Sequence, residues 1–162
     1  MALPRFLVGI DLGTTNCALA YIDTLQERPE TRILSIPQLR APGQLEEALT
    51  MPSCCYIASP EERKRGTLRL AWQSAAAGET AVGIYAYAQL AATPSRVVQS
   101  AKSWLCHGDV DREAPILPWG SEEVAAAHKL SPVAVSSCYL RHLHAAWNAS
   151  IGAHNAEYRL ER

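Results

Sequence analysis

One short stretch near the amino terminus, residues 6–22, constrains the fold of this chain more than any other. Its sequence, FLVGIDLGTTNCALAYI, consists of two apolar runs that flank a polar turn at residues 13–16. Apolar runs of this length, bounded by glycine and small polar residues, are typical of two strands that pair with each other. The stretch therefore predicts a β-hairpin.

The turn of this hairpin has the composition of a phosphate-binding site. A single carboxylate, Asp11, precedes the four turn residues Gly13, Thr14, Thr15 and Asn16. An acid at the end of a buried strand is costly unless it is paired, and a metal ion or its water shell is a natural partner. Backbone N–H groups and hydroxyls can bind phosphate. A purely structural hairpin, in which glycine adopts a positive φ and the polar residues simply favour turns, is the alternative.

Other known phosphate motifs and several function classes are excluded by pattern and composition. The chain contains neither GxxxxGK[ST] nor GxGxxG. Its 162 residues suffice for one domain, and 48% hydrophobic with 19% charged residues is a soluble, globular composition. A net charge of -1 gives no reason to expect nucleic acid or an acidic membrane as partner. The amino terminus lacks the pattern of a signal peptide, so we expect none, and no apolar run approaches the ~20 residues of a membrane span.

The cysteines indicate a reducing environment. There are five of them, an odd number, and no two have CxxC spacing, which argues against a disulfide framework or a zinc site. Three lie inside apolar runs, where a free cysteine behaves as a small hydrophobic residue. We therefore expect free thiols and a cytoplasmic location.

Downstream of the hairpin the chain alternates short predicted elements with loops. A third strand at 31–37 is expected to pair back onto the hairpin. The other predictions are a loop with at most one helical turn at 38–49, strands at 54–58 and 66–72 joined by a turn at 59–65, a helix at 85–93, a short helix or irregular segment at 95–105, and mostly loop at 107–122.

The best-defined element is a long helix near the carboxyl terminus. Ser131 and Pro132 supply an N-cap and a first-turn proline, and Gly152 is expected to end the helix. Apolar residues recur at intervals of three and four and predict one buried stripe. These residues are Val133, Val135, Tyr139, Leu140, Leu143, Ala146 and Trp147.

Several separated motifs resemble one protein family, the seventy-kilodalton heat-shock chaperones of the DnaK type. The sequence GIDLGTTN at 9–16 is similar to the family's first phosphate hairpin, and TMPS at 50–53 to its TTPS segment. Val82-Gly83, an alanine-rich helix and Pro94 resemble its IG…A…NP stretch. Ala101-Lys102 matches an AKRLIG-like segment, and the helix starting at 130–132 resembles its crossing helix. The resemblance covers nearly the whole chain.

The resemblance implies an α/β architecture, a mixed sheet with helices in the actin-like ATPase (ribonuclease-H-like) fold. It implies that residues 1–162 form only the first part of lobe I of a nucleotide-binding domain. Residues 1–37 would hold the phosphate hairpin and third strand, 38–120 an inserted subdomain, and 130–152 the crossing helix. The rest of that domain and the substrate-binding domain have no counterpart in these residues.

The resemblance also implies residue roles in binding ATP or ADP with Mg²⁺. Asp11 would hold the metal through water. Gly13, Thr14, Thr15 and Asn16 would bind the phosphates, with Thr14 near the γ-phosphate. Lys102 would point at the γ-phosphate and stabilise its charge. The sequence departs from the family after that lysine, where Ser103-Trp104 and Cys106-His107 replace Arg-Leu and Ile-Gly. Without the resemblance, Lys102 would be a solvated surface charge.

The expected function is therefore that of the amino-terminal part of an ATP-dependent chaperone. Its partners in a full-length protein would be ATP, unfolded polypeptides and co-chaperones. We expect the chain alone to be inactive, and to be capable of self-association through an unpaired sheet edge. Two alternatives remain: a sugar kinase or other phosphotransferase of the same fold, and a non-catalytic interaction or regulatory fragment.

Overall fold

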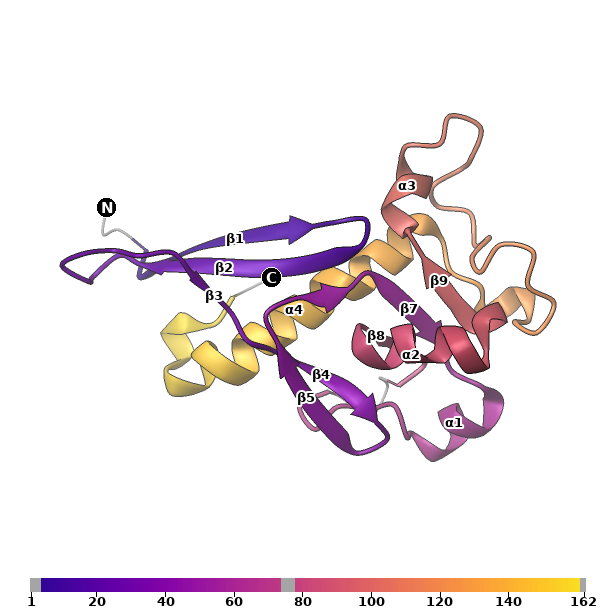
Figure 1. The fold of residues 1–162 in the computed structure, drawn as a ribbon, viewed down its shortest axis with the longest axis horizontal. Helices are drawn as coiled ribbons and strands as arrows, with labels where there is room; N and C mark the ends of the chain where they lie inside the picture. The colour runs from indigo at the N-terminus through magenta and orange to yellow at the C-terminus, as the bar shows by residue number, and fades with distance from the viewer. Residues whose placement is uncertain (1–3, 74–77, 161–162) are drawn as a thin grey trace.

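A computed structural model describes residues 4–73 and 78–160 of the chain, which has a mixed α/β architecture with antiparallel sheets and helices (Figure 1). The strands are β1 (Phe6–Leu12), β2 (Asn16–Asp23), β3 (Arg32–Ile33), β4 (Ile36–Ala41), β5 (Gln44–Ala48), β6 (Met51–Pro52), β7 (Cys54–Ile57), β8 (Thr80–Val82) and β9 (Val97–Gln99). The α-helices are α1 (Pro60–Arg65), α2 (Ile84–Ala92), α3 (Ala101–Leu105) and α4 (Pro132–His154). Three 3₁₀ turns complete it, η1 (Pro94–Arg96), η2 (Ala126–His128) and η3 (Ala156–Tyr158).

The predicted hairpin and third strand form an antiparallel meander. β1 pairs with β2 from Phe6 opposite Asp23 to Leu12 opposite Cys17, and β3 pairs with the other side of β2. The short strand β6 extends this sheet, because it also pairs with the start of β2. In the described part of the chain β1 pairs only with β2, so the other edge of β1 is open. The predicted hairpin is confirmed, whereas the third strand predicted at 31–37 is confirmed only at Arg32–Ile33, because Ile36 and Pro37 belong to β4 in another sheet.

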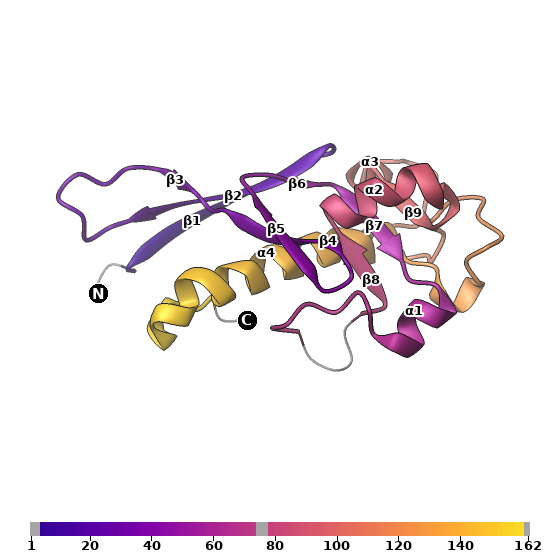
Figure 2. The same ribbon diagram turned by 60° about the horizontal axis from the view of Figure 1, so that its bottom comes forward.

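Helix α4 lies across the inner face of the meander (Figures 1 and 2). Ser131 caps it, since its hydroxyl accepts a hydrogen bond of 3.0 Å from the Ala134 amide. Most of the predicted stripe is buried, with Trp147 packed edge-on against Phe6 and Tyr21. Two members of the stripe were predicted wrongly: Val133 and Leu140 are each 40% exposed, at the margin of the buried face.

The predicted end of this helix was also wrong, because α4 runs past Gly152 to His154. Gly152 is buried where the tail of the chain returns along the helix. A Cβ there would lie 3.0 Å from Arg159 Cγ and 3.1 Å from Asn148 Oδ1. The glycine therefore permits close packing of the tail and does not end the helix.

A second sheet, with β7 between β8 and β9, lies beside the meander and is covered by α2 (Figure 2). The predicted strand at 54–58 and helix at 85–93 are confirmed as β7 and α2. The undecided segment 95–105 contains both a strand, β9, and a short helix, α3. Residues 107–122 are mostly turns and loops, as expected.

Three local predictions were wrong. The segment expected to be a loop at 38–49 is largely a β-hairpin of β4 and β5, with Gly43 at a φ of +74° in its turn. The strand expected at 66–72 is a series of turns, although Leu68 and Leu70 are buried. The expected turn at 59–65 is helix α1, which begins with a reciprocal capping box between Ser59 and Glu62.

The buried side chains form two clusters. One joins the meander to α4 and to the nearby ends of β7, β8, β9 and α3; its largest members include Leu19, Ile36, Met51, Tyr139, Leu143 and Trp147. The other lies between the second sheet, α2 and the turns at 66–73; its members include Leu39, Tyr56, Leu68, Leu70 and Tyr85. Among the described helices, none combines the length and apolar character needed to cross a membrane.

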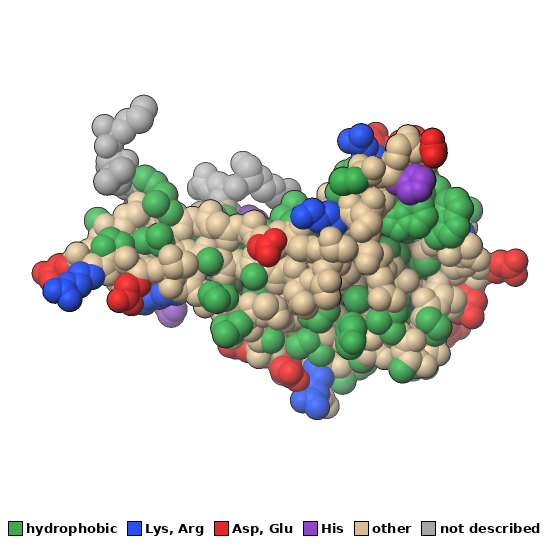
Figure 3. Space-filling view, turned by 45° about the horizontal axis from the view of Figure 1, so that its top comes forward, with side chains coloured by type: hydrophobic (Ala, Val, Ile, Leu, Met, Phe, Trp, Pro, Cys, Tyr) green, Lys and Arg blue, Asp and Glu red, His purple; other side chains and the backbone are tan. Residues whose placement is uncertain are grey.

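The outer face of the meander carries apolar side chains in contact with solvent. Alternation along β1 and β3 places Leu7 and Ile33 on the face opposite α4, and each is 53% exposed. Figure 3 shows hydrophobic side chains scattered over this end of the molecule.

Candidate phosphate-binding site at the hairpin turn

The turn between β1 and β2 lies beside α3 in both ribbon views (Figures 1 and 2). The meander supplies the turn, β6 runs alongside it, and α3 carries Lys102. Three segments that are far apart in the sequence therefore meet at one end of the hairpin.

The shape of the turn requires glycine at position 13. A Cβ on Gly13 would collide with the backbone carbonyl of Asn16. Gly13 is not among the residues of positive φ, so the alternative explanation of this glycine by a left-handed conformation is wrong. Its role is to let two stretches of backbone approach closely.

Ser53 fixes the turn from the side of β6. Its hydroxyl donates to the Gly13 carbonyl at 2.7 Å, and its backbone N–H donates to the Thr15 carbonyl at 2.8 Å. Cys17 Sγ lies 3.3 Å from the same hydroxyl, and Ser53 itself is buried. These bonds hold two carbonyls of the turn towards the protein.

Two N–H groups of the turn are left open. Among the hydrogen bonds of the described residues, none has the backbone N–H of Thr14 or Thr15 as its donor, whereas the N–H of Gly13 is directed at the Cys17 sulfur. Thr14, Thr15 and Asn16 are also exposed. The turn thus presents backbone donors and two hydroxyls to solvent, which is the arrangement that an anion can use.

Asp11 and Lys102 both act electrostatically on a single sulfur, that of Cys17. Burial raises the pKa of Cys17, and hydrogen bonds from Ser53 and Gly13 oppose the rise. The negative charge of Asp11 raises this pKa further, whereas the positive charge of Lys102 lowers it. The two charges therefore lie close to the start of β2, one on each side of the turn residues in the sequence.

Both charged side chains are exposed, which corrects part of the sequence argument. Asp11 was expected at the end of a buried strand, where a partner would have to offset its desolvation. It lies instead opposite Ala18 on the exposed outer face of the meander. Its position leaves it free to interact with a hydrated cation, but burial does not force it to find one.

No cluster of three or more His, Cys, Asp or Glu side chains that could hold a metal ion occurs in the part of the chain that the structure describes. Asp11 can contribute one carboxylate to a metal whose other ligands are water and phosphate oxygens. His142 and His144 on α4 have different partners and do not form a common site. Nε2 of His142 donates to the Pro37 carbonyl at 3.0 Å, and Nε2 of His144 to the Leu160 carbonyl at 2.7 Å.

The part played by Ser53 was not predicted from the sequence. The TMPS segment was recognised only as a family-like pattern, and its last residue is the one that bonds to the turn. A small hydroxyl residue directly before a buried strand was the available signal.

Comparison with known protein families and with curated proteins gives no match.

Proposed function

We propose that the turn at residues 13–16 binds the terminal phosphates of a Mg²⁺–nucleoside triphosphate, as the first phosphate hairpin of an actin-like ATPase of the DnaK type. The observation that supports this most is the convergence at one turn of unbonded backbone donors, the bracing Ser53 and two opposite charges. A hairpin with a purely structural role does not require this combination of features.

Each group has a distinct part in the proposed site. The amides of Thr14 and Thr15 donate to phosphate oxygens, and the Thr14 hydroxyl lies near the terminal phosphate. Ser53 keeps the turn carbonyls away from the anion, which would otherwise be repelled. The ammonium group of Lys102 stabilises negative charge as the terminal phosphoryl group is transferred.

Magnesium fits this donor set as a hydrated ion. Asp11 would hold it through its water shell, because a single carboxylate and several waters is a usual environment for Mg²⁺. When bound, the ion would neutralise charge on the phosphates.

The named groups contact only phosphate and metal. We therefore expect binding by this chain to be weak and indifferent to the base, with no measurable hydrolysis. In an intact ATPase of this kind, partner segments would contact adenosine, and the function would be chaperoning of unfolded polypeptides in the cytoplasm with co-chaperones. A sugar kinase would use the same turn, so the reaction class rests on the family resemblance alone.

The proposal can be tested by titrating the ¹⁵N-labelled 162-residue chain with Mg²⁺–ATP, Mg²⁺–tripolyphosphate and adenosine. We expect the amide signals of residues 13–16 to shift with the first two ligands, at millimolar concentrations, and not with adenosine. Lys102→Ala should weaken this response several-fold. Lys64→Ala, which changes an exposed lysine on α1, is the matched control and should not.

Two results would contradict the proposal. One is the absence of any shift at the turn with either phosphate ligand. The other is an equal response in the Lys102→Ala and Lys64→Ala variants, which would remove Lys102 from the site. Micromolar affinity for Mg²⁺–ATP would contradict the narrower expectation that the chain holds only the phosphate end of a site.

A further inference from the structure

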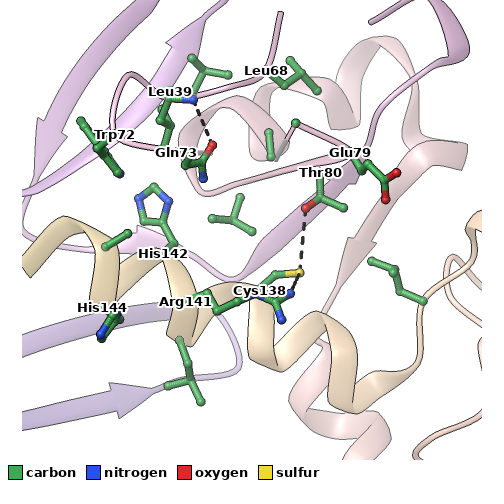
Figure 4. Close-up of a pocket in the computed structure, with 17 residues that line it drawn as sticks. Leu39, Leu68, Trp72, Gln73, Glu79, Thr80, Cys138, Arg141, His142 and His144 are labelled. Atoms are coloured by element: carbon green, nitrogen blue, oxygen red, sulfur yellow. Dashed lines mark hydrogen bonds between the residues drawn. The ribbon is translucent and has the colours of Figure 1, made fainter. Parts of the chain in front are cut away.

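A cavity of about 1010 Å³ lies against α4, away from the hairpin turn (Figure 4). Its walls come from α4, from β8 and from the turns at 66–73. They are largely apolar and include Leu39, Leu68, Leu70, Trp72, Leu130 and Leu140. The ionisable side chains on its walls are Glu79, Arg141, His142 and His144, together with one thiol, that of Cys138. The proposed phosphate site uses none of these groups.

Cys138 is held by polar contacts on the cavity wall. Nη2 of Arg141, one helical turn further along α4, donates to Cys138 Sγ at 3.1 Å. The Thr80 hydroxyl on β8 lies 3.9 Å from the same sulfur (Figure 4). A cationic donor directed at a sulfur is the contact expected for a thiolate.

A second thiol lies behind the first. Cys55, on the central strand β7, is completely buried, and Cys138 packs against the buried cluster to which Cys55 belongs. Both cysteines are free thiols. The two thiols therefore lie in one region between α4 and β7, with Cys138 on the cavity wall and Cys55 in the core.

The surroundings shift the pKa values of the two thiols in opposite directions. A hydrogen bond from Cys55 lowers the pKa of Cys138, and burial opposes this effect. The positive charge of Arg141 and the hydrogen bonds from Thr80 and Arg141 lower the Cys138 pKa further. The bond that Cys55 donates, together with burial, raises the pKa of Cys55 well above its usual range. Cys138, the thiol that contacts the guanidinium, is therefore the more readily ionised of the two.

We propose that Cys138 and Cys55 form a redox-active dithiol, in which Cys138 is the nucleophile for a small hydroperoxide that enters the cavity and Cys55 is the resolving thiol. The supporting geometry is the packing of two free thiols in one buried cluster, the guanidinium on one of them and the access that the cavity gives to that one. Cys17 and Cys54 are buried without such a contact to a cation, and Cys106 is exposed and stands apart from this cluster.

The chemistry balances in two steps. The Cys138 thiolate attacks one oxygen of the hydroperoxide, so that an S–O bond forms, the O–O bond breaks and an alcohol (or water, from hydrogen peroxide) leaves with the peroxide proton. The sulfur loses two electrons and the peroxide gains them. Once the sulfenate takes up a proton, the Cys55 sulfur attacks the Cys138 sulfur; the S–S bond forms, the S–O bond breaks, and water leaves with the Cys55 proton.

The test uses the full 162-residue chain and stoichiometric hydrogen peroxide, followed by alkylation of remaining thiols and peptide mass mapping. We expect a Cys55–Cys138 disulfide that a dithiol reductant reverses. In Cys55→Ser the reaction should stop at Cys138 sulfenic acid, which dimedone captures. Cys106 provides an internal comparison, because it is an exposed thiol in the same molecule.

A second measurement does not require oxidation. Iodoacetamide should alkylate Cys138 faster than Cys106 at neutral pH. At about pH 5, below the Cys138 pKa of about 6, Arg141→Gln should slow Cys138 alkylation by up to about tenfold, because a rise of roughly one pKa unit then lowers the thiolate fraction by that factor. Arg40→Gln, which removes an exposed arginine elsewhere, should leave the rate unchanged. Alkylation of Cys138 no faster than that of Cys106, or oxidation without the Cys55–Cys138 bond in the unmodified chain, would overturn the proposal.

Discussion

Replacement of Gly13 by alanine tests the central structural element, the turn of the hairpin. The added methyl group would collide with the Asn16 carbonyl. That carbonyl has little freedom to move, because Asn16 pairs with Pro52 and Ser53 bonds to the residues on either side of Thr14. The collision therefore has to be relieved by moving backbone.

The structure also offers a matched control, Gly9, in the strand β1 that leads into the turn. A Cβ built on Gly9 meets no atom within 4 Å. Forcing backbone shifts in a packed site costs about 1–3 kcal/mol. Gly9→Ala should instead be neutral or stabilise by up to about 1 kcal/mol, since alanine restricts the unfolded chain. We expect the two variants to differ by about 1–4 kcal/mol in the free energy of unfolding.

Urea denaturation followed by tryptophan fluorescence and circular dichroism measures this difference. For a chain of this size, each kcal/mol corresponds to about 2–4 °C in Tm, so thermal unfolding provides a second reading. The Gly13→Ala variant should also lose the response of the turn amides to Mg²⁺–tripolyphosphate. Equal midpoints for Gly13→Ala and Gly9→Ala would refute the argument that close backbone approach fixes glycine at the turn.

Two further predictions concern the dependence of stability on pH, measured as urea midpoints across the acid and neutral range. Burial acts to raise the pKa of Glu62, but bonds from Ser59, Tyr56 and Tyr85 outweigh it and hold that pKa low. The ionised Glu62 side chain therefore makes its full contribution to the free energy of unfolding above about pH 4.3, and this contribution is lost as the pH falls through the lower pKa of the folded state. Glu62→Gln should cost about 1–2 kcal/mol of stability at neutral pH and reduce the loss of stability in acid. Burial lowers the pKa of His142, against an opposing bond to the Pro37 carbonyl. Stability should fall below about pH 6.5 by up to about 1.4 kcal/mol per pH unit, and His142→Gln should remove that slope; an unchanged slope would contradict the assignment.

The elements that were predicted correctly are those with local signals. Alternating apolar residues around a glycine turn specify the β1–β2 hairpin, and Ser131 with Pro132 specifies the start of α4. Helix α1 had an equally local signal, the capping box from Ser59 to Glu62, which was interpreted as a turn.

The elements that were missed depend on contacts between distant residues. The β4–β5 hairpin is supported by the buried side chain of Gln38, which donates to the Thr50 carbonyl and accepts from the Ile84 amide. The alternation at Leu68 and Leu70 reflects burial under α2 and the second sheet, and not strand pairing. Neither fact can be read from a window of neighbouring residues.

The same division holds for the candidate sites. Asp11 and the turn residues 13–16 were enough to propose a phosphate-binding turn, and Lys102 was added by the family resemblance alone. The bracing of that turn by Ser53 and the location of Cys55 and Cys138 in one region depend on how β7 and α4 pack. The sequence contains these residues but holds no pattern that pairs them.

The segment from Met51 to Ile57 connects the two sheets and belongs to both of them. Met51 and Pro52 pair with β2 in the meander, and Cys54–Ile57 pair with β8 and β9 in the second sheet. Ser53, which bonds to the hairpin turn, is separated from the Cys55 thiol by a single residue. The two sheets cannot slide independently at this point, because proline and paired strands leave the connecting backbone little freedom. A phosphate bound at the turn and a bond from Cys55 to α4 would therefore both constrain the same short segment of backbone.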